Sequence, residues 1–305
     1  MSKYLIIDGT ALVFRGFYAI ARLTTSSGQP TNAIYGFYTI LFNLLLEQKP
    51  DYFTICFDRA EETERKKEFG EYKAQRTKAP DDLYSQIEPI KKILQDGNLC
   101  LLEKAGTEAD DLIATLAKKN ASLNPDLDIY IYSSDLDLMQ LVGGKIKVLR
   151  PGNSQTGNTL FDTDGVFKKY GFLPKYIPDY KGLHGDSSDN IPGVKGIGTK
   201  TATDLIQKYG DIENIYNNLE KITGATKTKL ENDKEQAFFY KKIATLFTDI
   251  ECEWNLSHYK PQNIKIEKII ELLEALEIKK LSDKITKIKK HYQIVESCDN
   301  QQSLF

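Results

Sequence analysis

The sequence has few residues suited to a disulfide framework or a zinc site. It contains four cysteines and three histidines among 305 residues, and no two cysteines form a CxxC pair. Cys56, Cys100, Cys252 and Cys298 are widely scattered instead. This spacing indicates reduced or buried thiols and argues against a zinc knuckle or a disulfide-stapled fold.

Long apolar runs are also absent. No stretch approaches the roughly 20 apolar residues of a membrane helix, and Met1-Ser2-Lys3 leads into the strand-like Tyr4-Leu5-Ile6-Ile7 without a signal-peptide pattern. With 41% hydrophobic residues, the chain can form one large domain or two ordinary ones. We expect a soluble cytoplasmic protein, associated with the nucleoid and not with a membrane.

Apolar runs alternate with segments of helical period up to about residue 150. This alternation predicts an α/β fold with a largely parallel sheet covered by helices. The expected strands are Tyr4 to Ile7, Tyr52 to Phe57, Leu99 to Glu103, Ile129 to Tyr132 and Ile146 to Leu149.

Acidic residues directly follow three of these strands. Asp8 follows the first, Asp58 the second, and Asp135 with Asp137 the fourth. Open α/β sheets bind ligands at the carboxyl ends of their strands, so we expect these carboxylates to gather at one edge. A cluster of carboxylates without histidine or cysteine selects hard ions such as Mg²⁺ or Mn²⁺ over zinc.

A further acidic group, Glu108-Ala109-Asp110-Asp111, opens a helical run after Thr107, a suitable N-cap. These acids could simply complement the helix dipole. On an ideal helix Glu108 and Asp111 share a face, whereas Asp110 lies about 200° from Glu108. Convergence of all three requires a splayed first turn or contacts through water, and the sequence leaves this open.

The segment from about Phe172 has a sequence pattern typical of helices and contains a glycine-rich turn. Asp186 and Asp189 precede the turn Gly193-Val194-Lys195-Gly196-Ile197-Gly198, and a second helix is expected to open at Thr199-Lys200-Thr201. This pattern is typical of a helix-hairpin-helix, whose glycines and helix-start amides let the backbone meet a phosphate without reading a base. A simple αα-hairpin turn is the alternative.

A charge-dense segment runs from Arg59 to Lys78, and most such runs are solvated helix faces. In Tyr72-Lys73-Ala74-Gln75-Arg76, the three-residue spacing places Lys73 and Arg76 on one helical face. If that face overhangs the acidic cluster, the two cations could hold the phosphate whose bond is cut.

Together and in this order, these motifs resemble the 5' nucleases of the flap endonuclease superfamily. The resemblance is greatest to the 5'-3' exonuclease domain of bacterial DNA polymerase I and its stand-alone relatives, over roughly residues 4 to 290. The motifs are Leu5-Ile6-Ile7-Asp8-Gly9, Phe14-Arg15-Gly16-Phe17-Tyr18, Phe57-Asp58, Tyr72-Lys73-Ala74-Gln75-Arg76, Glu108-Ala109-Asp110-Asp111, Ser134-Asp135-Leu136-Asp137 and the Gly185 to Gly198 block.

The resemblance implies a PIN-like nuclease core with a mostly parallel central sheet, a helical arch over the site and a C-terminal all-helical helix-hairpin-helix (H3TH) region. We expect a catalytic domain at residues 1–170, with the arch at about 59–90. A DNA-binding domain would follow at 171–290 and a flexible tail at 291–305.

The resemblance also implies roles for individual residues. Lys73 and Arg76 would be the catalytic cations of the arch. The metal ligands would be Asp8, Asp58, Glu108, Asp110, Asp111, Asp135, Asp137, Asp186 and Asp189. The DNA-binding residues would be Arg15, Tyr18, Arg65, Lys195, Gly196, Gly198, Thr199 and Lys200, with Tyr18 stacking on an unpaired base.

Two Mg²⁺ ions, replaceable by Mn²⁺, would activate a water and stabilise the leaving 3' oxygen. Asp8, Asp58, Glu108 and Asp110 would mainly hold one ion and Asp135, Asp137 and Asp189 the other, with Asp111 and Asp186 acting through water. A potassium ion could bind at the helix-hairpin-helix. Setting these nine acids aside from 43 leaves 34 acidic against 41 basic residues, which predicts a positive remaining surface despite a net charge of -2.

Three positions depart from the family pattern. Leu136 stands where a basic residue is usual, which puts a phosphate contact in doubt. Glu64 replaces a common aromatic residue, and His184 replaces an apolar one, where we expect a packing role.

The last five residues, Gln301-Gln302-Ser303-Leu304-Phe305, look like the peptide by which bacterial replication and repair proteins dock on the sliding clamp. Leu304 and Phe305 would fill an apolar pocket, with Gln301 as polar anchor. A chance match or a disordered tail explains the pattern equally well.

The sequence therefore predicts a Mg²⁺-dependent, structure-selective 5'-3' exonuclease and 5'-flap endonuclease. It would act without sequence readout on DNA flaps and 5' ends in primer removal and repair, giving 5'-phosphate products. A non-catalytic DNA-junction binding module is the alternative; a haloacid-type phosphatase fails because Ile6 occupies the place of its nucleophilic aspartate. Several points stay open: whether the nuclease works with DNA polymerase I activity in cis or in trans, how exonuclease and flap cleavage balance, and whether RNA or DNA 5' ends are preferred.

Overall fold

The computed structural model describes residues 1–153 and 156–294. The expected clamp-binding residues Gln301, Leu304 and Phe305 lie outside these ranges. Within the two ranges, no helix has the length and apolar character needed to cross a membrane.

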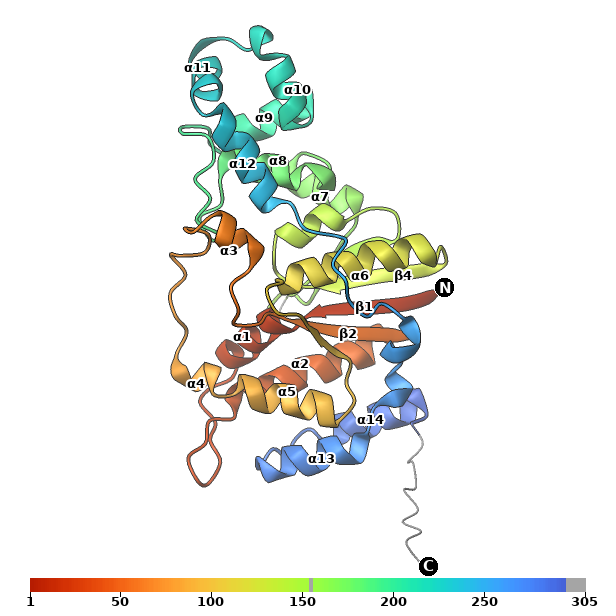
Figure 1. Ribbon diagram of the computed structural model, residues 1–305. Helices are drawn as coiled ribbons and strands as arrows, with labels where there is room; N and C mark the ends of the chain where they lie inside the picture. The colour runs from red at the N-terminus through yellow and green to blue at the C-terminus, as the bar shows by residue number, and fades with distance from the viewer. Residues whose placement is uncertain (154–155, 295–305) are drawn as a thin grey trace, which may run out of the picture.

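A six-stranded sheet forms the centre of the molecule, in the order β3-β2-β1-β4-β5-β6 (Figure 1). Five strands run parallel and β6 pairs antiparallel with β5. The strands are β1 (Ser2–Asp8), β2 (Tyr52–Phe57), β3 (Leu101–Glu103), β4 (Leu127–Tyr132), β5 (Ile146–Arg150) and β6 (Thr159–Phe161). The five expected strands are confirmed, whereas the short edge strand β6 was not expected.

Alternate residues of β1 pack against different helices, because successive side chains of a strand point to opposite faces. Tyr4 and Ile6 belong to one core cluster with α6 (Ala109–Leu123). Leu5 and Ile7 belong to the other, with α1 (Gly9–Ala19), α2 (Asn32–Gln48) and α5 (Ile87–Asp96). Both faces of the sheet are therefore covered, as a parallel sheet requires.

Helices α1 and α2 pack in direct backbone contact. A Cβ on Gly16 would lie 2.6 Å from the amide nitrogen of Phe37. Any side chain at Gly16 would push the two helices apart, so this glycine of the Phe14-Arg15-Gly16-Phe17-Tyr18 motif has a packing role.

The expected arch corresponds to the connection between β2 and α5, which contains only two short helices, α3 (Glu64–Glu68) and α4 (Asp81–Tyr84). The expectation that Lys73 and Arg76 share a helical face is wrong. Residues 71–75 form turns, and Lys73 has a left-handed backbone with φ of 56°. Its amide donates to the carbonyl oxygen of Asp189 at 3.0 Å, a tertiary contact that a continuing helix would not make.

Residues 163–244 form a helical region at one end of the sheet (Figure 1). Its α-helices are α7 (Thr163–Tyr170), α8 (Ile177–His184), α9 (Thr199–Tyr209), α10 (Ile212–Asn217), α11 (Gly224–Asn232) and α12 (Lys234–Ala244). The chain then returns along the sheet to α13 (Ile266–Ala275) and α14 (Ser282–Tyr292), which pack on α5 and α2. Short 3₁₀ helices lie at Asp137–Leu141, Pro174–Tyr176, Leu219–Lys221, Leu256–Tyr259 and Pro261–Asn263.

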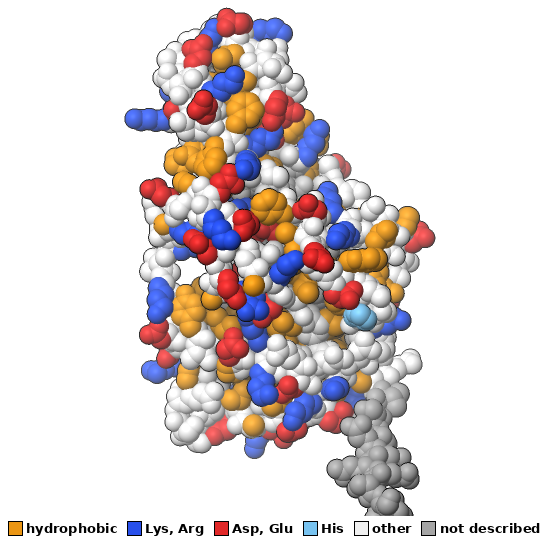
Figure 2. All heavy atoms as spheres, viewed as in Figure 1, with side chains coloured by type: hydrophobic (Ala, Val, Ile, Leu, Met, Phe, Trp, Pro, Cys, Tyr) orange, Lys and Arg blue, Asp and Glu red, His pale blue; other side chains and the backbone are white. Residues whose placement is uncertain are grey.

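Basic and acidic side chains are interspersed over the face shown in Figure 2. The charge count predicted a positive surface outside the acidic site, and the face in Figure 2 carries both signs of charge.

Candidate active site

The carboxylates that follow the strands are held by backbone and hydroxyl donors at the sheet edge. Asp8 accepts hydrogen bonds from the Ala11 amide at 2.9 Å and from the Ser133 hydroxyl at 2.8 Å. Asp58 accepts from the Ala109 amide at 2.9 Å and thereby caps α6 from another strand. Helix α6 accordingly begins at Ala109 with Glu108 as N-cap residue, one position later than the expected Thr107 cap.

The carboxylates of Asp8, Asp58, Asp110 and Asp135 share this edge, and within residues 1–153 and 156–294 no ion pair joins any of them to a cation. Burial raises the pKa of Asp8 to about 7, and the charges of Asp58 and Asp135 add to the shift. Burial also raises the pKa of Asp110 well above its ordinary value, with the charges of Asp135 and Asp8 as further causes. The mutual repulsion of these acids favours the binding of a cation among them.

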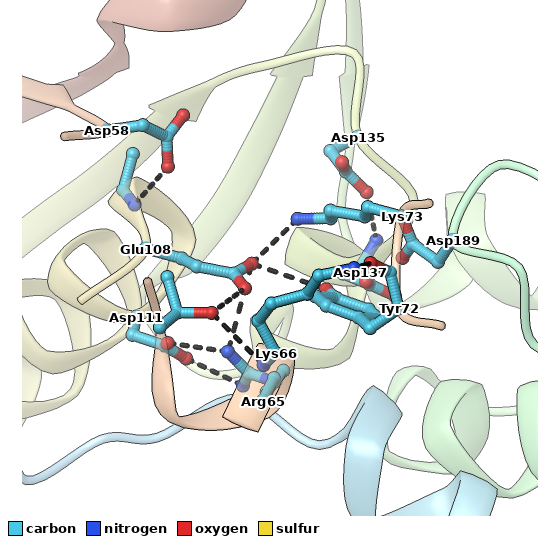
Figure 3. Close-up of polar contacts among 12 residues, drawn as sticks. Asp58, Arg65, Lys66, Tyr72, Lys73, Glu108, Asp111, Asp135, Asp137 and Asp189 are labelled. Atoms are coloured by element: carbon cyan, nitrogen blue, oxygen red, sulfur yellow. Dashed lines mark hydrogen bonds and ion pairs between the residues drawn. The ribbon is translucent and has the colours of Figure 1, made fainter. Parts of the chain in front are cut away.

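Lys73 lies over this edge and pairs with Glu108 (Figure 3). Its Nζ is 2.7 Å from Oε2 of Glu108, and the hydroxyl of Tyr72 donates to the same oxygen at 3.2 Å. Burial opposes the charge on Lys73, but the attraction of Glu108 outweighs it, so the pKa of Lys73 is raised and the side chain stays cationic.

Arg65 and Asp111 form a buried bidentate ion pair on the other side of Glu108 (Figure 3). The two nitrogen-to-oxygen distances are 2.6 and 2.8 Å, and the side chains are 4% and 3% exposed. Arg65 also donates to the carbonyl oxygens of Ile243 and Thr245, and Asp111 accepts from the amide of Phe247. Both side chains, expected to meet DNA and metal, are therefore engaged within the protein.

The first turn of α6 separates the three acids whose convergence the sequence left open. Asp110 faces the Asp8 side, Glu108 contacts Lys73, and Asp111 contacts Arg65. This divergence agrees with the helical spacing between Glu108 and Asp110.

A second acidic group surrounds Lys181 of α8, a residue that the sequence analysis did not single out. The Lys181 side chain is 2% exposed; its Nζ contacts Asp137 and lies 2.6 Å from Asp186 and 3.6 Å from Asp189. Arg76 reaches the other oxygen of Asp189 at 2.9 Å. A lone lysine in a helical run carries no local signal for such a position.

The side chains of residues 1–153 and 156–294 include no group of three acids, histidines or cysteines arranged to hold a metal ion. Several of the acids are instead paired with cations of the protein. Glu108 pairs with Lys73, Asp111 with Arg65, and Asp137 and Asp186 with Lys181. The donor set at the Asp8 edge still fits a hard divalent cation, because it consists of carboxylates and is short of positive charge.

Apart from Arg65, which pairs with Asp111, the expected DNA-binding residues form no ion pair with the carboxylates in the described part of the chain. Tyr18 is 66% exposed at the end of α1, and Arg15 donates to the carbonyl of Gly152. In the hairpin, Lys195, Gly196, Gly198, Thr199 and Lys200 are all exposed, and Gly196 has φ of 80°. His184 stacks on Tyr180 and bonds with Thr199 at 3.0 Å, which agrees with the packing role expected for it.

The segment that carries Lys73 and Arg76 contacts Glu108 at the carboxylate edge and also Ser188 and Asp189, which precede the hairpin turn. The fold and the site thus define a class, the nucleases that combine a carboxylate centre on an α/β core with a separate hairpin for the DNA backbone.

The chain belongs to the 5'-3' exonuclease family. Family models match the 5'-3' exonuclease N-terminal resolvase-like domain over residues 3–171 and the C-terminal SAM fold over residues 172–268. A 5'-3' exonuclease of Aquifex aeolicus is 41% identical over 288 residues, which cover 94% of this chain and 96% of that protein.

A DNA polymerase I of Caldicellulosiruptor bescii is 40% identical over 281 residues, or 92% of this chain. The match covers 33% of that protein, so the chain spans about a third of the length of this polymerase relative.

Solved structures share the fold at lower identity. The T5 5'-exonuclease with bound zinc has a TM-score of 0.65 at 21% identity, covering 96% of this chain and all of that one. The catalytic core of Rad2 in complex with a DNA substrate has a TM-score of 0.60 at 16% identity, covering 94% of this chain and 92% of that one.

Proposed function

We propose that the chain is a divalent-metal-dependent 5'-3' exonuclease and 5'-flap endonuclease. It would hydrolyse phosphodiester bonds of DNA without sequence readout, give 5'-phosphate products, and serve primer removal and repair. The observation that carries the proposal is the carboxylate edge of the sheet beneath Lys73, in a chain 41% identical to a 5'-3' exonuclease over nearly its whole length.

The metal ions we propose are two Mg²⁺, with Mn²⁺ as substitute. Asp8, Asp58, Asp110 and Asp135 are the ligands with the best support, because they repel one another and none of them forms an ion pair within the described part of the chain. Asp137, Asp186, Asp189 and Glu108 could join them once Lys181 and Lys73 move aside, whereas the pairing with Arg65 makes Asp111 a supporting residue. Bound divalent ions would neutralise charge on the scissile phosphate and lower the pKa of a water.

Lys73 and Arg76 act on the phosphate in this proposal. Their cationic groups now rest on Glu108 and Asp189, at the border of the carboxylate edge. A phosphate arriving there would compete with Glu108 for Lys73 and with Asp189 for Arg76, whose side chain is half exposed. Both cations would stabilise the charge that grows on the phosphate oxygens.

The hairpin would hold the duplex part of the substrate by its backbone, because its exposed amides and lysines suit phosphates and offer no base readout. Beyond Asp58 lies a cavity of about 620 Å³, lined by Phe14, Tyr84 and Ile87 among others. This space would receive the unpaired 5' strand.

We also propose that residues 1–170 form a catalytic part and residues 171–290 a DNA-binding part. Helices α13 and α14 contact α5 and α2 and so add to the catalytic part. Docking on a sliding clamp through Gln301, Leu304 and Phe305 is a separate proposal: deleting residues 301–305 should abolish clamp binding and leave nuclease activity intact.

The deciding experiment uses a 3'-labelled duplex with a 5' single-stranded flap, incubated with Mg²⁺ and with EDTA. Cuts at the flap junction are expected in Mg²⁺ only. Asp135→Asn should abolish cleavage and keep DNA binding, whereas the exposed Asp126→Asn serves as the matched control. Tight binding without cleavage by the wild type, in Mg²⁺ and in Mn²⁺, would instead support a non-catalytic junction-binding module.

A further inference from the structure

The first turn of α2 is capped by a side chain from the far end of the arch. Thr31, at the N-cap position of α2, makes no side-chain cap bond within the described part of the chain. Gln86, the residue before α5, supplies the cap instead. Its Oε1 accepts from the amides of Ala33 at 2.8 Å and Ile34 at 3.2 Å. Since the first amides of a helix have no partner within it, this distant cap takes the place of a local one.

The side-chain nitrogen of Gln86 extends this contact in two directions. Its Nε2 donates to Oδ1 of Asn32 at 3.2 Å and to the carbonyl oxygen of Asp82 at 2.7 Å. Asn32 in turn donates from Nδ2 to the carbonyl oxygen of Phe17 at 3.1 Å, near the end of α1. Gln86 is 1% exposed and Asn32 5%, so water has little access to these bonds. One buried chain of hydrogen bonds therefore joins the end of the arch to α2 and α1.

The elements that this chain of bonds joins also line the cavity of about 620 Å³ beside the carboxylate edge. Phe14 lines it from α1, and Tyr84 and Ile87 line it from the end of the arch and the start of α5. Gln86 lies between the latter two in the sequence, and its side chain is bonded to α2. The separation of these lining residues decides how wide the cavity is, and the bonds of Gln86 and Asn32 fix that separation.

We infer that Gln86 is a positioning residue for the unpaired 5' strand. Through Asn32 it holds residues 84–87 at a fixed separation from α1 and so sets the width of the cavity that the strand enters. This inference rests on the proposed function, in which that cavity receives the strand. Gln86 touches no reacting atom; it acts through the lining residues that it holds, as the supporting residues of a preorganised site do.

Two carboxylate variants break the chain of bonds at different points and leave the cap of α2 in place. In Gln86→Glu the side chain still accepts from the two amides but no longer donates to Asn32. In Asn32→Asp it still accepts from Gln86 but no longer donates to Phe17. Both variants place negative charge at the N-terminus of α2, where the helix dipole favours it, so both should fold.

Gln95→Glu is the matched control, because it makes the same change at an exposed position of α5. Circular dichroism melts establish that the variants are folded. Fluorescence anisotropy in EDTA then measures binding of the full chain to a duplex with a 5' flap and to the same duplex without the flap. The ratio of the two affinities gives the contribution of the unpaired strand. Single-turnover cleavage of the flapped duplex in Mg²⁺ gives the rate, and product sizes give the cut positions.

We expect the wild type and Gln95→Glu to bind the flapped duplex more tightly than the flapless one and to cut it at one main position. Gln86→Glu and Asn32→Asp should lose most of that preference and keep the wild-type affinity for the flapless duplex. Their cleavage should slow by about tenfold or more and spread over neighbouring positions, because a misplacement of about 1 Å can slow a reaction about a hundredfold.

Variants that match Gln95→Glu in flap preference and in cut position would overturn the inference. So would variants that lose affinity for both duplexes equally, since a general structural defect has that effect. A wild type that cuts at the flap junction but binds both duplexes equally well would overturn it too. A wild type that cuts the flapped duplex in neither Mg²⁺ nor Mn²⁺ would overturn the proposed function itself, which distinguishes the two failures.

Discussion

Lys73 combines an unfavourable backbone conformation with a functional charge. Its φ of 56° is rare for a residue with a side chain, and its amide and ammonium are held by Asp189 and Glu108. Strain of this kind persists where surrounding contacts impose it, and it clusters at functional sites. The residue is placed by the site and not by its local sequence.

Lys73→Ala and Lys73→Gly should separate strain from function. Both variants should cleave a 5' flap far more slowly while binding it nearly as well, because the lost ammonium acts on the transition state. Lys73→Gly should be more stable than Lys73→Ala by about 1 kcal/mol, since glycine adopts the left-handed backbone without penalty. Single-turnover cleavage, binding and urea unfolding measure the three quantities; equal losses in binding and cleavage would contradict the assigned role.

The positive charge of the buried Lys181 side chain offsets the negative charges of three neighbouring carboxylates. Lys181→Met should lower the free energy of unfolding by about 3 to 5 kcal/mol, because it leaves Asp137, Asp186 and Asp189 without their buried cation. Mn²⁺ should restore more stability to this variant than it adds to the wild type. Urea unfolding with and without Mn²⁺ gives the comparison, and Lys175→Met, on the exposed surface, provides the control. A variant as stable as wild type without metal would refute the balancing role.

At the scale of elements, one buried ion pair joins three segments. Arg65 lies on α3, Asp111 on α6, and both bond to the chain just after α12, at Thr245 and Phe247. The base of the arch is thereby attached to the core and to the helical region.

A double-mutant cycle on this pair tests whether Asp111 supports the structure or holds metal. Arg65→Met and Asp111→Asn should each destabilise the protein by about 3 to 5 kcal/mol, as expected when one buried partner is removed. The double variant should lose at least 1 kcal/mol less than the sum. Calorimetric Mn²⁺ titration supplies the second readout: loss of metal binding in Asp111→Asn but not in Arg65→Met would make Asp111 a ligand.

The elements themselves differ in how far the sequence predicts them. The strands were predictable because short apolar runs that are rich in β-branched and aromatic residues and bounded by turn residues are typical of buried strands. The arch was not, because Tyr72 and Lys73 are positioned by Glu108 and Asp189, which are distant in sequence.

At the scale of the whole molecule, the carboxylate edge should make stability depend jointly on pH and metal. The folded-state pKa of Asp8, about 7, exceeds the value of about 3.9 expected in the unfolded chain. Ionising Asp8 therefore disfavours the folded state, and the metal-free protein loses this contribution as pH rises from about 4 to about 7.

Divalent metal should offset that loss. The increase in thermal midpoint caused by Mn²⁺ should be larger at about pH 8 than at about pH 5, because protons compete with the metal for Asp8 and its neighbours at low pH. Thermal melts at the two pH values with Mn²⁺ or EDTA measure the difference. A shift that is equal at both would argue against metal binding at this edge.

The sequence by itself determined the sheet, the acids at the ends of its strands and the glycine turn, because each depends on local periodicity or on a short motif. Only the tertiary structure decided how those acids are used. Asp8 and Asp110 lie close enough to repel each other, whereas Asp111 forms an ion pair with Arg65 and Asp137 forms one with Lys181. The role of a buried charge depends on which opposite charge the fold brings beside it, and Arg65 and Lys181 reach these partners from distant parts of the chain.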